Sequence, residues 1–119
     1  MLTGRFARQQ RLTQASEFKN VFAEPCVKQG DASMLILGIK NNHHTARLGL
    51  AVAKKQLKRA VSRNRFKRLT RESFRHHLDI IKDLDVVVIA RAGAEKRTNR
   101  ELLDTLSKNW HILRKKCEK

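Results

Sequence analysis

The sequence predicts an α+β fold, an α/β sandwich in which helices pack against one mixed β-sheet. Two runs of β-type composition, 32–40 and 46–53, follow each other closely, and a third run at 85–91 is continuously apolar. The segments before, between and after them carry apolar residues at helical spacing. We therefore expect the order helix, two or three strands, helix, strand and helix. The 119 residues show no internal repeat and no linker, so we expect one domain over 1–119.

The N-terminal region is expected to be an irregular basic arm followed by a helix. Residues 1–11 are basic and aperiodic. Thr13 is suited to be the N-cap of a helix over 14–24, and Pro25 ends that helix because the residue before a proline disfavours the helical conformation. The apolar side of this helix consists of Ala15, Phe18, Val21 and Phe22.

The first two strands are predicted to form a hairpin. The sequence NNHH makes a turn between the runs 32–40 and 46–53, and strands joined by a short turn pair antiparallel. In the second strand, large side chains alternate with glycine and alanine. The large residues on one face are Leu48, Leu50 and Val52, and the small ones on the other are Gly49, Ala51 and Ala53. The nearly bare face either lets a helix pack closely or forms an open groove for a ligand.

A basic helix, a buried strand and a last helix complete the predicted fold. The helix is expected over 57–80 and the strand over 85–91, which must be covered on both faces because it is apolar throughout. A strand, a helix and a strand in this order imply a parallel crossover unit. Thr98 and Glu101 have the spacing of a capping box, which begins the last helix. The apolar side of that helix consists of Leu102, Leu103, Leu106, Trp110 and Leu113.

The charge of the chain favours a polyanionic partner. Lysine and arginine number 27 against 11 acidic residues, which gives a net charge of +16 and a pI near 11.0. Nucleic acid would relieve the resulting self-repulsion, whereas acidic proteins and membrane surfaces fit this charge density less well. The N-terminus lacks the apolar stretch of a signal peptide, and no run approaches the roughly 18 apolar residues that span a bilayer. We expect a cytoplasmic protein without a membrane partner.

The positive charge is concentrated on one side of the basic helix. Between residues 54 and 75, ten residues are lysine or arginine and one, Glu72, is acidic. At about 100° per residue, the side that should pack on the sheet carries Phe66, Leu69, Ser73, Phe74 and His77. The opposite side carries Asn64, Arg68, Arg71 and Arg75, with Arg63 and Lys67 at one margin and Arg65 beyond the other.

This basic side suits a phosphate backbone. Arginine offers a planar pair of donors to phosphate oxygens, and asparagine can reach a 2′-hydroxyl or a base edge. An ordinary solvated helix face would carry more acidic residues, because like charges at these spacings repel by a few tenths of a kcal/mol per pair. Composition and spacing therefore indicate nucleic acid binding without deciding between RNA and DNA.

The basic helix and its surroundings resemble the bacterial ribonuclease P protein family. The string AKKQLKRAVSRNRFKRLTRESFR at 53–75 contains that family's RNR motif, here at 63–65. The residues that accompany the motif are Lys67, Arg68, Arg71 and Glu72 on the same helix and Lys54 and Lys55 before it. The likeness extends to RLTQASEFKNVF at 11–22 and to DVVVIAR at 85–91.

The resemblance implies a fold detail and two RNA-binding surfaces. The crossover that carries the RNR helix would be left-handed, against the usual preference. The helix would dock on a catalytic RNA through Arg63, Asn64, Arg65, Lys67, Arg68, Arg71 and Arg75. A cleft between the first helix and the sheet would bind the single-stranded 5′ leader of precursor transfer RNA. The residues implied there are Phe18, Phe22, Lys54, Lys55, Arg11, Arg47 and Arg91.

The resemblance also implies that the chemistry takes place outside the protein. The particle would hydrolyse the phosphodiester bond that joins the leader to mature transfer RNA, with Mg²⁺ held mainly by the catalytic RNA and the substrate. The protein would strengthen substrate and metal binding, contribute no catalytic residue and need no organic cofactor. One protein would bind one catalytic RNA, and no protein partner is implied. Phe18 and Phe22, one turn apart, either stack on unpaired bases or fill the core beneath their helix.

The remaining reactive residues suggest no further site. Cys26 and Cys117 are far apart and make no CxxC pair, so we expect free thiols. The histidine pairs at 43–44 and 76–77 are adjacent residues that project in different directions, unlike zinc ligands. We therefore expect no metal site made by the protein.

Three other functions fit parts of the sequence. A ribosomal or other structural RNA-binding protein would have similar size and charge but no cleft for a single strand. A helix-turn-helix DNA-binding protein would need a recognition helix after a short turn, whereas a buried-type strand follows the basic helix here. A helix bound to a membrane surface would need an apolar side free of Ser73 and His77 and not occupied by a core.

Overall fold

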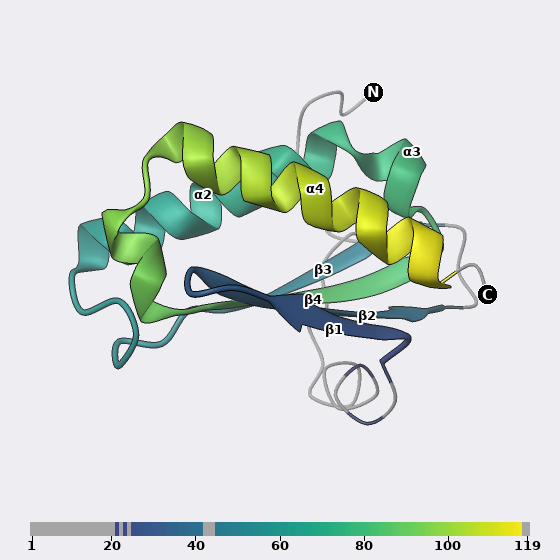
Figure 1. Cartoon of the computed structure of the whole chain (residues 1–119), viewed down its shortest axis with the longest axis horizontal. Coiled ribbons are helices and arrows are strands. Elements are labelled where there is room, and N and C mark those ends of the chain that lie inside the picture. Colours follow the sequence, from purple (N-terminus) through teal and green to yellow (C-terminus); the bar gives the residue numbers. More distant parts are fainter. Residues whose placement is uncertain (1–20, 22, 24, 42–44, 118–119) are drawn as a thin grey trace.

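The computed structural model describes residues 21, 23, 25–41 and 45–117 and has the predicted α+β architecture. Its elements are β1 (Val27–Gly30), β2 (Met34–Lys40), β3 (Arg47–Ala51), α2 (Ala60–His76), α3 (Leu78–Ile81), β4 (Leu84–Ala90), η2 (Ala92–Lys96) and α4 (Asn99–Cys117). The helices cover one face of a four-stranded sheet (Figure 1). Most of the helix predicted over 14–24, with Thr13 as its N-cap, lies outside the described residues.

The sheet has the strand order β1-β2-β4-β3, which corrects the predicted hairpin. β2 and β3 do not pair with each other, although only residues 41–46 separate them in the sequence. Instead β4 lies between them, antiparallel to β2 and parallel to β3. The physical reason is burial, because β4 is buried along nearly its whole length. A central position pairs both edges of such a strand and covers both of its faces.

The edge strand β1 completes the sheet and lacks a clear strand pattern in its sequence. It pairs antiparallel with β2, and its sequence VKQG contains one large apolar residue. Asp31 shapes the turn that joins the two strands. Its Oδ1 accepts hydrogen bonds from the backbone nitrogen of Ser33 at 2.7 Å, from the Ser33 hydroxyl at 2.5 Å and from the backbone nitrogen of Met34 at 3.3 Å.

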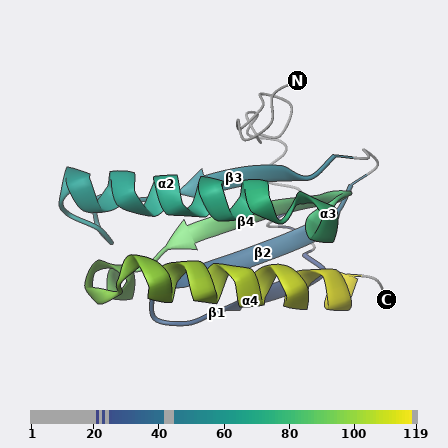
Figure 2. The same ribbon diagram turned by 90° about the horizontal axis from the view of Figure 1, so that it is seen from above.

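β3, α2 and β4 form the predicted parallel crossover unit. The register pairs Gly49 with Val87 and Leu50 with Val88. When Figure 2, seen from the helix side, is turned so that these strands point upward, α2 lies in front and the chain steps leftward from β3 to β4. The crossover is therefore left-handed, as the family resemblance implies. In the same view α2 lies over the β3 side of the sheet, and α4 lies over the β1 side.

The basic helix is shorter than predicted. It ends at His76, and the separate helix α3 begins at Leu78. His77 interrupts the helical conformation with φ −122° and ψ 21°. Its Nδ1 donates a hydrogen bond to the carbonyl of Ser73 at 2.6 Å, which fixes the end of α2.

The last helix begins at the predicted capping box and packs through its apolar side. The backbone nitrogen of Glu101 donates to Thr98 Oγ1 at 3.1 Å, and that of Thr98 donates to Glu101 Oε1 at 2.8 Å. Trp110 Nε1 donates to Ser73 Oγ at 2.8 Å, and its ring meets that of Phe74 edge to face at 6.0 Å. The buried apolar residues of α4 are Leu102, Leu106, Trp110, Leu113 and Cys117.

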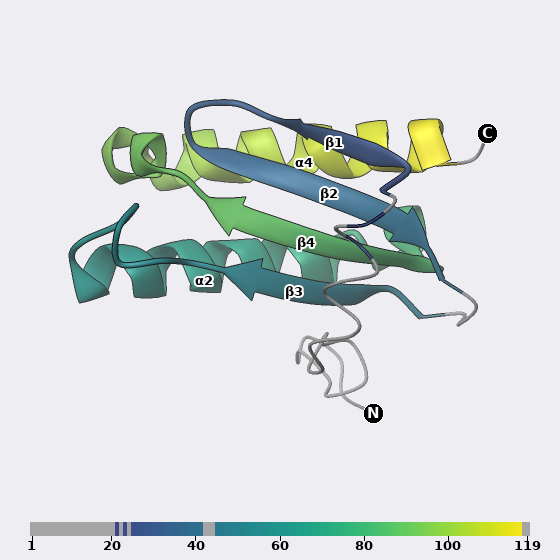
Figure 3. The same cartoon turned by 90° about the horizontal axis from the view of Figure 1, so that it is seen from below.

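The main core lies between the sheet and the helices. Leu48, Leu50 and Val52 pack into it, which confirms the predicted alternation along 46–53. A smaller cluster on the far face of the sheet consists of Val21, Leu37 and Val87. Figure 3 shows this far face, with β2 and β4 in its middle. Val21, which belongs to a helical segment, thus covers the middle of the face that α2 and α4 leave free.

Candidate nucleic-acid interface

α2 turns one side to the core and a basic side to solvent. Its buried residues are Ser62, Phe66, Leu69, Thr70, Ser73 and Phe74. On the other side Asn64, Arg68 and Arg71 are exposed, whereas Arg75, on the same side, and Lys67, at its margin, are half-buried. Among the described residues, no side-chain hydrogen bond or ion pair involves Asn64, Arg68 or Arg71. We call Asn64, Arg68 and Arg71 the exposed basic face, because these groups are available to a partner.

Arg63 and Arg65 of the RNR motif bind the protein's own backbone instead. Arg63 Nη1 donates to the carbonyls of Leu57 and Lys58, both at 2.9 Å. This contact holds the segment that leads into α2. Both arginines are half-buried, in contrast to the asparagine between them.

Arg65 joins α2 to the start of α4. Its Nη1 donates to the carbonyl of Arg97 and to Asn99 Oδ1, both at 2.9 Å, and its Nη2 donates to the carbonyl of Ala94 at 3.0 Å. Three acceptors from η2 and its connection to α4 therefore occupy this guanidinium group. The position beyond the margin that helical geometry predicts for Arg65 corresponds to this contact with η2.

A carboxylate from η2 supports the start of α2. The helix has no acidic residue in its first turn and no side-chain cap at its N-cap residue, Arg59. Glu95 Oε2 accepts hydrogen bonds from Ser62 Oγ and from Arg59 Nη2, both at 2.6 Å. These two bonds, that from Ser62 first, lower the pKa of Glu95. Beside them Val61 is 65% exposed, at the rim of a hollow of about 160 Å³.

The residues predicted to bind the leader differ in their surroundings. Lys54 and Lys55 are exposed in the turn after β3. Arg91 Nη1 donates to the carbonyl of Asp31 at 2.9 Å, so this side chain ties β4 to the β1–β2 turn. The predicted leader residues that lie outside the described part of the chain are Arg11, Phe18 and Phe22.

Arg47 forms the most buried ion pair among the described residues. Its Nε and Nη2 donate to the two carboxylate oxygens of Asp85 at 2.8 and 2.7 Å, and the side chains are 16% and 7% exposed. Asn41 Nδ2 also donates to Asp85 Oδ1, at 2.7 Å. A bidentate pair of this kind fixes side-chain direction. Asp85 therefore positions Arg47. The sequence does not indicate this role, because Asp85 is one of three acids, at 79, 83 and 85, that lie close together near a predicted turn.

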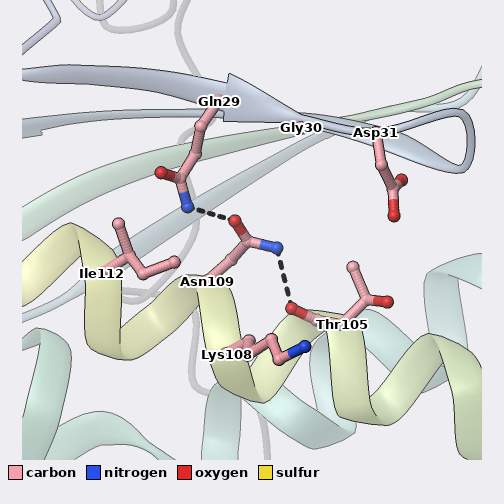
Figure 4. Close-up of a pocket in the computed structure, with 7 residues that line it drawn as sticks. All are labelled: Gln29, Gly30, Asp31, Thr105, Lys108, Asn109 and Ile112. Carbon is pink, nitrogen blue, oxygen red and sulfur yellow. Dashed lines mark hydrogen bonds between the residues drawn. The ribbon is translucent and has the colours of Figure 1, made fainter.

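A second hollow, of about 290 Å³, lies between β1 and α4 (Figure 4). Gln29 Nε2 donates to Asn109 Oδ1, and Asn109 Nδ2 donates to the carbonyl of Thr105 at 2.7 Å. One hydrogen bond thus joins β1 to α4 across the hollow, and Asn109 is held by its own helix. It lies on the β1 side of the molecule, whereas the exposed basic face belongs to α2 on the β3 side (Figure 2).

Comparison with known proteins assigns the chain to a family. The sequence model of the family described as Ribonuclease P matches residues 6–114. The chain belongs to the ribonuclease P protein family. The ribonuclease P protein component of Pseudoalteromonas atlantica is 42% identical over 116 residues, covering 96% of this chain and 94% of the relative. That of Vibrio vulnificus is 44% identical and covers 95% of each.

Solved structures of ribonuclease P proteins have the same fold. That from Staphylococcus aureus at 2.0 Å gives a TM-score of 0.78 at 29% identity, covering 87% of this chain and 94% of the other. That from Thermotoga maritima gives 0.74 at 28% identity, covering 86% and 96%. The fold class predicted from the sequence is confirmed. The chain is therefore a protein component of ribonuclease P, the ribonuclease that matures transfer RNA, and it associates with an RNA partner.

The structure adds residues that the motif does not contain. Arg59, Ser62 and Glu95 build the start of α2 next to the RNR motif of this ribonuclease P family member. The sequence hints at their role only by what the basic helix lacks. It begins without a capping residue or an acidic residue in its first turn, so another element must supply these groups. No group of three or more His, Cys, Asp or Glu side chains among the described residues is placed to hold a metal ion. None of the helices described between Val21 and Cys117 is long and apolar enough to cross a membrane.

Proposed function

We propose that the protein is the RNA-binding subunit of a ribonuclease P particle and docks on the catalytic RNA through α2. The observation that carries this proposal is the exposed basic face of Asn64, Arg68 and Arg71. The opposite side of α2 is buried, so the helix is held rigidly while these three side chains remain unpaired in the described structure. Because the helix backbone is already fixed, binding to phosphates has to order only the side chains.

The exposed basic face is matched to an RNA backbone in three respects. Each neutralised phosphate releases counterions, so affinity falls with salt with a slope of about −0.7 to −0.9 per contact. The half-buried Arg75 on the same side and Lys67 at its margin add positive charge to the surface. Arg63 and Arg65 each have five N–H donors, of which their backbone contacts use part, and they add positive charge beside Asn64.

For the substrate, we propose that the 5′ leader of precursor transfer RNA binds beside the helical segment that contains Val21, on the far face of the sheet. Ala51 is half-buried and Ala53 exposed there, and Lys54 and Lys55 follow at the end of β3. Small side chains next to exposed lysines suit a strand of nucleotides. Phe18 and Phe22 would stack on its bases, with Arg11, Arg47 and Arg91 nearby.

The reaction itself is proposed to take place in the RNA. Mg²⁺ ions held by the catalytic RNA and the substrate would supply the chemistry of phosphodiester hydrolysis. The protein's residues would bind the leader and raise the affinity for substrate and for metal by reducing phosphate repulsion. One protein per catalytic RNA and action in the cytoplasm complete the proposal.

The test mixes this protein with a bacterial ribonuclease P RNA at low Mg²⁺ and measures removal of the 5′ leader. We expect cleavage in the presence of the protein at a Mg²⁺ concentration where the RNA alone is nearly inactive. If the protein were instead a ribosomal or other structural RNA-binding protein, it would bind RNA without making cleavage faster. RNA binding that leaves the cleavage rate unchanged at every Mg²⁺ concentration would refute the proposed role.

A further inference from the structure

The fold brings the two cysteines together, although they are far apart in the sequence. Cys26 immediately precedes β1, and its backbone nitrogen donates to the carbonyl of Gly38 at 2.7 Å. Gly38 is also where α4 approaches the sheet most closely, because a Cβ there would lie 2.7 Å from Leu113 Cδ2. Cys117 is one helical turn beyond Leu113 and faces the same way. Backbone and packing contacts therefore place Cys26 and Cys117 at the same end of the β1–α4 contact.

The two thiols also interact directly. Burial raises the pKa of the Cys117 thiol to about 12, assisted by its hydrogen bond with the Cys26 side chain and by the charge of Cys26, while Arg114 and Lys40 act in the opposite direction. Cys117 is 2% exposed, whereas Cys26 is exposed. An exposed thiol next to a buried one is the arrangement in which the first meets an oxidant and the second resolves the product.

We propose that Cys26 and Cys117 form a reversible disulfide when the protein meets a peroxide. The Cys26 thiolate attacks one peroxide oxygen, the O–O bond breaks, and water leaves after protonation, so that Cys26 becomes a sulfenic acid. The sulfur of Cys117 then attacks the Cys26 sulfur, the S–O bond of the sulfenic acid breaks, and the departing hydroxyl takes up the Cys117 proton and leaves as a second water. Two thiols lose two electrons and two protons in total, and one peroxide is reduced to two waters. A dithiol restores both thiols by exchange.

The first oxidation relieves part of what raises the pKa of Cys117. Two of its causes, the hydrogen bond with Cys26 and the charge of Cys26, require Cys26 in its thiol or thiolate form. Conversion of Cys26 to a sulfenic acid removes the negative charge, while Arg114 and Lys40 remain and favour the Cys117 thiolate. Burial, the largest cause of the raised pKa, is unchanged by the first oxidation, but the two smaller causes that come from Cys26 are relieved.

The cross-link would join the last turn of α4 to the residue that precedes β1. It would close a loop that contains all four strands and all the helices described after Cys26. A loop of this length strongly restricts the unfolded chain, so the oxidised protein should melt on the order of 10 °C higher than the reduced one. The cross-link involves α4, which lies over the β1 side of the sheet, whereas α2 with its exposed basic face lies over the β3 side (Figure 2). RNA binding through α2 should therefore survive oxidation.

The experiment treats the full-length protein with hydrogen peroxide in moderate salt and follows free thiols, intact mass and melting temperature. We expect loss of both thiols, a mass decrease of two hydrogens, a monomer, a peptide pair containing Cys26 and Cys117, and reversal by dithiothreitol. Cys26→Ser is the matched variant, because its side chain is exposed and the fold does not depend on it. It should show no oxidation-dependent rise in melting temperature.

Two results would overturn the proposal. One is a wild-type protein that keeps a free Cys117 thiol while Cys26 is converted to a sulfinic acid or to a disulfide between two protein molecules. The other is a disulfide between Cys26 and Cys117 that forms in peroxide only when urea unfolds the protein and not in the folded protein. Cys117→Ala is the second variant, because alanine is only slightly smaller than cysteine. After peroxide treatment it should form no intramolecular disulfide and show no rise in melting temperature.

Discussion

Arginines on one helix can serve folding or binding, and the contacts of their guanidinium groups separate the two roles in α2. Arg63 and Arg65 donate to carbonyls of neighbouring segments, whereas Arg68 and Arg71 have no such partners among the described residues. Because a buried carbonyl that loses its donor is costly, the first pair is expected to matter for stability. The second pair is expected to matter for RNA alone.

Arg68→Ala and Arg71→Ala should weaken binding to the catalytic RNA without unfolding the protein. Each change removes one phosphate contact, so the slope of log affinity against log salt should become shallower by about 0.7 to 0.9. The free energy of unfolding should stay within about 0.5 kcal/mol of wild type, because both side chains are exposed. Filter binding across a salt series, with thermal melting alongside, checks both. Unchanged RNA affinity in both variants at moderate salt would count against docking through α2.

Arg65→Ala should destabilise the protein by about 1–3 kcal/mol, because the carbonyls of Ala94 and Arg97 lose their donor. Arg65→Lys keeps the charge but cannot reach three acceptors with planar geometry, so it should recover only part of the loss. Urea unfolding measures the difference, with Arg71→Ala as the matched control on the same helix. Wild-type stability in Arg65→Ala would show that the contact with η2 and α4 contributes nothing.

At the scale of whole elements, sequence periodicity predicted what depends on local burial. The alternation along 46–53 placed Leu48, Leu50 and Val52 in the core, and the continuous apolar run at 85–91 predicted a strand covered on both faces. The apolar side of the last helix and its capping box are also as predicted. Each of these features is a property of a single segment, so a single segment suffices to reveal it.

Apart from the parallel crossover of β3 and β4, features that depend on pairing between distant segments were not predicted. A short turn suggested that 32–40 and 46–53 form a hairpin, but β4, buried throughout, occupies the place between them. The sequence left the number of strands before α2 at two or three, because the four residues of β1 lack apolar alternation and their strand conformation depends on β2. The acceptors of Arg65 come from 29 to 34 residues away, which helical geometry alone cannot supply.

The turn between β1 and β2 should be sensitive to acid through Asp31. Partial burial raises the pKa of this carboxyl, but hydrogen bonds from Ser33 and Met34 and the charge of Arg97 hold it below its ordinary value of 3.8. A carboxyl whose pKa is lower in the folded than in the unfolded state contributes its full stabilisation to the fold at pH values above its unfolded pKa. That stabilisation is lost as pH falls through the lower folded value.

Asp31→Asn should therefore remove part of the acid sensitivity. We expect wild type to be more stable than the variant at pH 6 and the difference to shrink as the pH falls below 4. Melting curves of both proteins from pH 6 to pH 3 measure this difference, so that contributions of other carboxyls cancel. A difference that stays constant over this range would show that the Asp31 charge does not hold the turn.

For the whole molecule, the scarcity of acids makes their positions informative. The ion pairs among the described residues are Arg47–Asp85, Arg59–Glu95, Arg97–Asp31 and Arg114–Asp83. All four join different elements or their connecting turns. The acids thus stabilise the places where elements meet, and the exposed basic face keeps its charge uncompensated. A chain with 27 basic and 11 acidic residues can in this way be folded and still bind a polyanion strongly.

Two separate surfaces on one scaffold should give two separate functional phenotypes. Lys54→Ala with Lys55→Ala should lower the affinity of the assembled particle for precursor transfer RNA about tenfold, or ~1.4 kcal/mol, while affinity for mature transfer RNA stays the same. The reason is that mature transfer RNA has no leader to contact these exposed lysines. Phe18→Ala should act in the same direction. Arg71→Ala is the control, because weaker docking on the catalytic RNA affects both ligands alike once enough protein is added to saturate it. Equal losses for precursor and mature transfer RNA in the lysine variant would place the leader elsewhere on the protein.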